Sequence, residues 1–249
     1  MKPDVFLNAE DELKLFLVKA NILPIAEVSL DMFSSAEKYT HNMVLLNQEG
    51  FERVVFQKLP SYSFMNSFCE YLTSTKVPYL GPTSIKSSFV DNNKVFQFVN
   101  FKFRISNNFK YLDLLSGNLS TFDYLKLWGW PDFEADAYLK AKNKLSFSDL
   151  QFKFFEAKEK EVLPEWCAYL MYVPATFDLV EEDVKLNTIA HCNNIKRFVR
   201  RNDSDLASRV EDYFLSKSYP FKKESDGSYF VDSKWISLYN SEYFAKVFN

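Results

Sequence analysis

The sequence is poor in glycine, and its few glycines are widely separated. Five occur in 249 residues, and no two lie close together: Gly50, Gly81, Gly117, Gly129 and Gly227. The P-loop and the dinucleotide fingerprint each need several glycines within a few residues. The nucleophile elbow of α/β-hydrolases needs a G-x-S-x-G segment. These motifs are therefore excluded, although a nucleotide or a cofactor can be bound without them, so the cofactor stays unknown.

Histidine and cysteine are also scarce, which limits metal and redox chemistry. The chain has two histidines and three cysteines, and the cysteines are far apart: Cys69, Cys167 and Cys192. Such a set is not a disulfide framework. Neither histidine follows a glutamate by three residues, as a helical di-iron site requires. Only His191 and Cys192 lie close together, and two adjacent helical positions do not easily face one zinc ion. We expect no disulfide and assign no metal site, while a magnesium or calcium site of scattered carboxylates stays open.

Long apolar runs and a strong net charge are absent as well. No stretch approaches the roughly 20 apolar residues that span a bilayer. The N-terminal segment is acidic and unlike a signal peptide. The formal net charge of −3 gives no general attraction to nucleic acid or to an anionic membrane. We therefore expect a cytoplasmic protein that does not enter the membrane, and the composition disfavours a general nucleic-acid binder.

The chain is instead rich in aromatic residues. It contains 26 Phe, 14 Tyr and 4 Trp, and 47% of its residues are hydrophobic against 25% charged. That balance is typical of a globular protein with a large core. Aromatic side chains are also enriched in pockets and interfaces, so we expect some of these rings to line one.

Hydrophobic periodicity predicts an α+β fold in which most strands precede most helices. Residues 1–106 are predicted to form an antiparallel sheet with two helices. Residues 107–249 are predicted to form a helical bundle with a terminal hairpin and helix, either as a second unit or in one compact domain with the first. This segregation argues against a doubly wound fold. The predicted strand at 23–30 is joined by hairpins at 41–59, 84–105 and 219–231. The predicted helices are 9–20, 61–72, a turn within 107–118, 120–128, 132–143, 147–161, 165–173, 178–201, 203–217 and 234–247.

Three local features are predicted around the second hairpin and the first helices after it. Gly81-Pro82 indicates a loop before the strand that begins at residue 84. The partner strand carries phenylalanines spaced by two, three and two residues, which indicates a bulge or a twist near Asn100. Gly129 is predicted to end one helix, and Pro131 to lie in the first turn of the next.

The segment from Asp178 to Arg201 gives the clearest amphipathic pattern. At about 100° per residue, one side collects a set of mainly apolar residues, with His191 at its edge: Val180, Val184, Thr188, Cys192, Ile195, Phe198 and Val199. Asp178 is a good N-cap, and the acidic first turn and basic last turn complement the helix dipole. Residues 202–204 are predicted to end this helix and to cap the next.

The other side of this helix is mixed. Apolar residues share it with the densest basic cluster of the sequence: Leu186, Ile189, Lys196, Arg197, Arg200 and Arg201. A solvated basic helix end is the simpler interpretation of the charges, but apolar residues beside them indicate that something packs there. Our first hypothesis is therefore a binding or accessory protein, a subunit that presents this side of the 178–201 helix to a protein partner.

A second hypothesis is an enzyme that acts on a small anionic substrate. Its pocket would lie between the sheet and the helices, lined by Trp166, Tyr169, Tyr172 and His191. Arg197 would anchor the anion, and His191 and Tyr172 would be the catalytic side chains. The simpler interpretation of His191 is a residue at the margin of the core that makes one hydrogen bond.

A third hypothesis, a metal-dependent nuclease or nucleic-acid binder, rests on weaker patterns. Glu156-Ala157-Lys158 has the E-x-K form of such nucleases, but the surrounding apolar residues follow helical spacing. The basic cluster 196–201 together with Arg209 is the one candidate for a nucleic-acid surface. Cys167 and His191 can form a dyad only if the fold brings them together, and a buried structural cysteine is the simpler interpretation.

Overall fold

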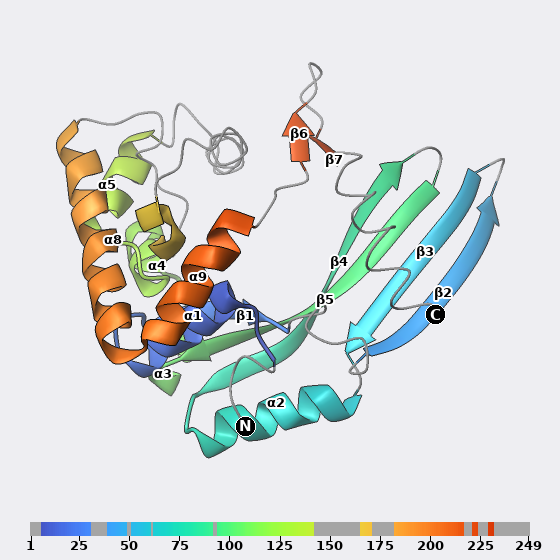
Figure 1. Cartoon of the computed structure of the whole chain (residues 1–249), viewed down its shortest axis with the longest axis horizontal. Coiled ribbons are helices and arrows are strands. Elements are labelled where there is room, and N and C mark those ends of the chain that lie inside the picture. The colour runs from blue at the N-terminus through green and yellow to red at the C-terminus, as the bar shows by residue number, and fades with distance from the viewer. Residues whose placement is uncertain are drawn as a thin grey trace.

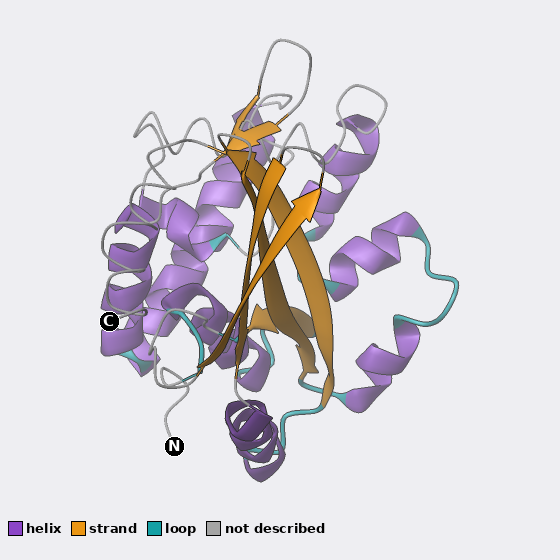
Figure 2. Cartoon of the chain, turned by 90° about the vertical axis from the view of Figure 1, so that its right-hand side faces the viewer, coloured by secondary structure: helices purple, strands orange, loops and turns teal. Residues whose placement is uncertain are grey.

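The structure, a computed structural model, has an α+β fold in which long antiparallel strands lie beside a group of helices (Figure 1). The perpendicular view looks from the side of the long strands, with the group of helices behind them (Figure 2). The structure describes residues 6–30, 39–48, 51–60, 62–91, 94–141, 165–170, 182–216, 221–223 and 229–231.

The strands of the described residues pair antiparallel in three groups. A three-stranded sheet has the order β1-β5-β4, and two hairpins pair β2 with β3 and β6 with β7. Strand β3 also lies beside β5, so the first long hairpin extends the surface of the three-stranded sheet (Figure 1). The strands are β1 (Ile25–Ser29), β2 (Tyr39–Gln48), β3 (Phe51–Pro60), β4 (Tyr79–Asp91), β5 (Lys94–Ser106), β6 (Phe221–Lys223) and β7 (Tyr229–Val231).

The helices confirm most of the predicted positions. They are α1 (Ala9–Lys19), α2 (Tyr62–Ser74), α3 (Phe109–Leu114), α4 (Thr121–Leu127), α5 (Asp132–Ala141), the 3₁₀-helix η3 (Glu165–Tyr169), α8 (Glu182–Asn202) and α9 (Ser204–Ser216). The helix predicted at 165–173 is shorter and of the 3₁₀ type, with the Leu170 N–H bonded to the Cys167 carbonyl at 3.1 Å. The helices predicted at 147–161 and 234–247 lie outside the described residues, as do residues 224–228 of the hairpin predicted at 219–231.

One prediction about the second hairpin is wrong, and the bulge considered near Asn100 is not found. Gly81-Pro82 is not a loop before the strand, because β4 begins at Tyr79 and includes both residues. The irregularity in the pairing lies there, between Leu80 and Thr83, whereas Asn100 pairs with Ile85 in regular register. Gly81 has a φ of 128°, and a Cβ there would lie 2.8 Å from the Lys102 carbonyl oxygen of β5. The glycine thus allows the irregular strand to approach its neighbour.

One hydrophobic core joins the sheet to the helices. Phe68 of α2 is fully buried, with its ring centroid 5.2 Å from that of Phe6 and 5.0 Å from that of Phe103 on β5. The same core continues through Leu13 of α1 to Val199 of α8 and thus includes residues from both predicted regions, 1–106 and 107–249. The boundary between these regions stays a prediction.

Helix α8 has the predicted buried side. Thr188, Cys192, Ile195 and Val199 are all buried, and Phe198 packs against the same core. The Thr188 hydroxyl donates to the buried Glu134 carboxylate of α5. The N-cap predicted at Asp178 and the apolar residue Val180 lie outside the described residues.

The joint between α8 and α9 also has the predicted form. Helix α8 ends at Asn202, α9 begins at Ser204, and the Asp203 carboxylate between them accepts a hydrogen bond from the Leu206 N–H at 2.9 Å. This is an N-cap contact. It fixes the reversal that brings α9 back along α8.

Gly129→Ala is expected to lower the free energy of unfolding by about 1–2 kcal/mol. Gly129 lies between α4 and α5 with a φ of 85°, and a Cβ there would clash with the side chain of the buried Leu23. Gly117→Ala is the matched control, because its nearest neighbour would be 3.4 Å away. Urea unfolding should therefore separate the two variants, and equal stabilities would contradict a constraint at Gly129.

Candidate functional site

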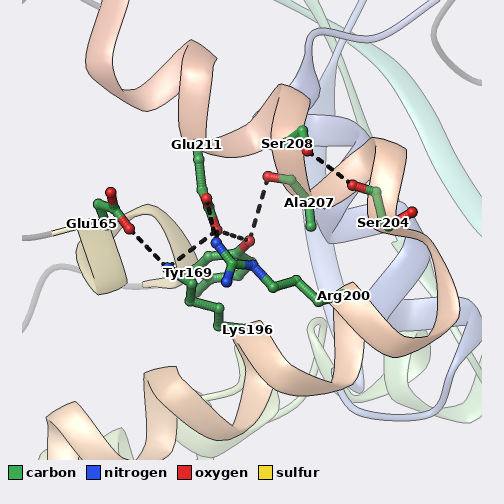
Figure 3. A network of polar contacts seen from close by, with 8 residues as sticks. All are labelled: Glu165, Tyr169, Lys196, Arg200, Ser204, Ala207, Ser208 and Glu211. Atoms are coloured by element: carbon green, nitrogen blue, oxygen red, sulfur yellow. Dashed lines mark hydrogen bonds and ion pairs between the residues drawn. The ribbon is translucent and has the colours of Figure 1, made fainter.

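The basic end of α8 divides into residues that are paired within the chain and residues that are not. Lys196 and Arg200 belong to the paired group (Figure 3). The Lys196 ammonium lies 3.0 Å from Glu165 Oε2 and 3.3 Å from Glu211 Oε1. One Arg200 nitrogen, Nη2, lies 2.8 and 3.0 Å from the two oxygens of Glu211. Both cations are therefore neutralised by acidic residues of η3 and α9.

Glu211 is the centre of this network, because Tyr169 also binds it. The Tyr169 hydroxyl donates to Glu211 Oε1 at 2.8 Å and lies 3.4 Å from the Ala207 carbonyl oxygen (Figure 3). Burial acts to raise the pKa of the Glu211 carboxyl, but hydrogen bonds from Arg200, Tyr169 and Lys196 outweigh it, and the pKa is lowered. Burial, with the adjacent Glu211, raises the pKa of the Tyr169 phenol. The network ties η3, α8 and α9 together with a neutral phenol and an ionised carboxylate.

The outward face of α8 is defined by Leu186, Ile189, Arg197 and Arg201, which share the solvent side of the helix with Arg200. Leu186 is 55% exposed, and Arg197 and Arg201 are also exposed, while Ile189 is half-buried. Arg197 hydrogen-bonds to Asn194 Oδ1 and to the Asn193 carbonyl oxygen of its own helix. Among the described residues, no carboxylate pairs with either arginine of this face. The face therefore combines an exposed apolar residue with two cations that no described carboxylate neutralises.

Three of the four residues that were predicted to line an enzyme pocket lie among the described residues. Tyr169 is fully buried, and its hydroxyl is bonded to Glu211. Trp166 is partly buried and packs against the main core. The His191 ring lies against Phe133, with centroids 6.4 Å apart, and burial lowers the pKa of its imidazole. Tyr172 lies outside the described residues, as does Glu156-Ala157-Lys158.

All three cysteines are free thiols, and the two near α8 are buried. Burial raises the pKa of the Cys192 thiol to about 12, with a further contribution from Glu134. Burial also raises the pKa of the Cys167 thiol, with a further contribution from Cys192. Because the thiolate is the reactive form, both cysteines are suited to packing rather than to nucleophilic chemistry.

Two absences hold for the described residues. No group of three or more His, Cys, Asp or Glu side chains within them is arranged to hold a metal ion. None of the helices that they form combines the length and the apolar character needed to cross a membrane.

Sequence reasoning missed the acidic partners of this region. It assigned Lys196 and Arg200 to a binding surface, but Glu165 and Glu211 neutralise them. It also grouped Arg209 with the basic cluster, whereas Arg209 binds Glu12 of α1 and Asp205. The detectable signal was Glu12 itself, a charged residue among the apolar positions of α1.

Comparison with known proteins adds no relative to these observations. No family model matches the chain, and no curated protein or solved structure matches it either. The functional argument therefore rests on the geometry of the chain itself.

Proposed function

We propose that this chain is a binding or accessory protein that docks a protein partner through the outward face of α8. The observation that carries the proposal is that the exposed Leu186 shares one side of α8 with Arg197 and Arg201, which have no carboxylate partner among the described residues. Leu186 and Arg197 are eleven positions, about three turns, apart on α8 and so lie on nearly the same line along the helix. An apolar contact combined with charged contacts at the edge is typical of a specific interface.

The pairing of the other cations supports the same assignment. Lys196 and Arg200 lie on the same helix, but their charges are matched by Glu165 and Glu211. The helix dipole favours basic residues at this end, yet the dipole gives no reason for an exposed leucine two turns or more away. The complementary partner surface would present an apolar side chain opposite Leu186 and carboxylates opposite Arg197 and Arg201.

The double charge reversal Arg197→Glu with Arg201→Glu is expected to weaken the complex at least about tenfold. Carboxylates on this face would repel those of the partner, while no intramolecular ion pair of the described residues is broken. Native mass spectrometry of the protein, purified gently from its own cells, would measure complex mass and stoichiometry. Titration with the isolated partner would then give the affinity.

The matched control is Lys110→Glu with Lys140→Glu, which makes the same charge change at exposed positions on α3 and α5. This control should leave complex mass and affinity unchanged. Unchanged affinity in the α8 double variant, or an equal loss in the control, would show that the outward face of α8 is not the docking surface.

A further inference from the structure

A cleft of about 890 Å³ lies between α1 and the corner where α8 meets α9. Its walls come from elements far apart in sequence: Phe16 and Lys19 of α1, Tyr71 of α2, Phe198 of α8 and Arg209 of α9. Pockets that hold small molecules have volumes of about 300–1,000 Å³. The cleft is therefore large enough for a small organic ligand, and it does not include the outward face of α8.

Aromatic rings form the apolar part of the cleft. The Phe16 and Phe198 rings lie with their centroids 5.9 Å apart at an angle of 52°. Both are only partly buried, and both pack against the main core. Tyr71 adds a third ring to the lining and is itself 9% exposed. Partly exposed rings that are held by the core present a fixed surface on which a flat ring can stack.

Most of the charges in the lining are already matched. The Arg209 guanidinium donates to both oxygens of the buried Glu12 carboxylate, and its Nε donates to Asp205 at 3.0 Å. Asp203 accepts the Leu206 N–H at the start of α9, where the helix dipole favours a negative charge. The carboxylates of the cleft are thus each engaged by a donor of the protein.

Lys19 is the cation of the lining that has no carboxylate partner among the described residues. Its ammonium lies 5.9 Å from the centroid of the Tyr71 ring, and its side chain is exposed at the end of α1. An ammonium beside aromatic rings attracts a ligand that carries a negative charge next to an apolar body.

We propose that this cleft binds a small aromatic carboxylate. Its ring would stack on Phe16 and Phe198, and its carboxylate would pair with the Lys19 ammonium. The proposal is independent of the docking surface on α8, because the two sites share no residue. Either can fail without affecting the other.

The test compares three probes of nearly equal shape and different charge, namely phenylacetate, phenethyl alcohol and phenethylamine. Ligand-observed NMR titration should show saturable binding of phenylacetate, with a Kd on the order of 1 mM for so small a molecule. Phenethyl alcohol should bind up to about fivefold more weakly, because it lacks the ion pair with Lys19. Phenethylamine should bind most weakly of the three.

Lys19→Gln should lower the phenylacetate affinity to that of phenethyl alcohol, and Lys110→Gln on α3 is the matched control that should leave it unchanged. Ala20→Trp, which fills the cleft from its lining, should abolish binding of all three probes. Each variant is compared at a temperature well below its own Tm, so that a failure to fold is recognised. The absence of saturable phenylacetate binding, tighter binding of phenethylamine, or an unchanged affinity in Lys19→Gln would each overturn the proposal.

Discussion

Arg209→Met is expected to lower the free energy of unfolding by about 3 kcal/mol. Methionine keeps much of the apolar volume of arginine but leaves the Glu12 carboxylate without its guanidinium. The Glu12 side chain is only 7% exposed, so water replaces the lost partner poorly. The expected loss is at the lower end for buried ion pairs, because the Arg209 side chain is 34% exposed. Urea unfolding at pH 7 measures the change.

The cause of this loss can be tested by removing the charge of Glu12, which Arg209→Met leaves without its partner. Glu12→Gln in the Arg209→Met background should restore most of the lost stability, because the buried group is then neutral.

Arg201→Met is the matched control, since Arg201 is exposed on α8 and pairs with no carboxylate of the described residues. It should change stability by less than about 0.5 kcal/mol. If Arg209→Met cost no more than this control, the contact between α1 and α9 would depend on packing alone.

Local patterns in the sequence were sufficient to predict the main elements. The buried side of α8 follows from apolar residues at helical spacing, and Asp203 was identifiable as a cap from its position alone. The two long hairpins follow from short apolar runs separated by turn residues. In each of these cases the information lies within one element or at its ends.

The prediction was wrong where a residue has two possible local roles. Glycine and proline usually mark a loop, but at Gly81-Pro82 they allow β4 to continue irregularly past β5. The choice between a loop and an irregular strand depends on the neighbouring backbone of Lys102, which is distant in sequence. Single-sequence patterns contain no information about that neighbour.

The pairing of charges was beyond sequence reasoning for the same reason. Arg200 and Glu211 are separated by a helix reversal, and Glu12 and Arg209 by most of the chain. The sequence showed that cations gather at the end of α8, but not which of them are neutralised. Only the fold separates the paired Lys196 and Arg200 from the exposed Arg197 and Arg201.

Tyr169→Ala is expected to lower the free energy of unfolding by about 3–5 kcal/mol, as for other large-to-small substitutions of buried aromatic residues. Tyr169 is among the largest fully buried side chains of the described residues, and it packs in the core that joins η3 to α8 and α9. The substitution removes the ring and leaves a cavity. It also removes one of the donors that hold Glu211 ionised. Urea unfolding at pH 7 measures the loss.

Tyr169→Phe separates the ring from the hydroxyl, because it retains the packing and removes only the bond to Glu211. It should cost about 1–2 kcal/mol, the contribution of a hydrogen bond to a charged group. Arg200 and Lys196 still neutralise Glu211 in this variant, so the carboxylate is not left unpaired. A loss in Tyr169→Phe as large as in Tyr169→Ala would instead show that the hydroxyl, and not the ring, supplies most of the stability that depends on Tyr169. A negligible loss in both would show that the Tyr169 ring and its network do not hold η3 against α8 and α9.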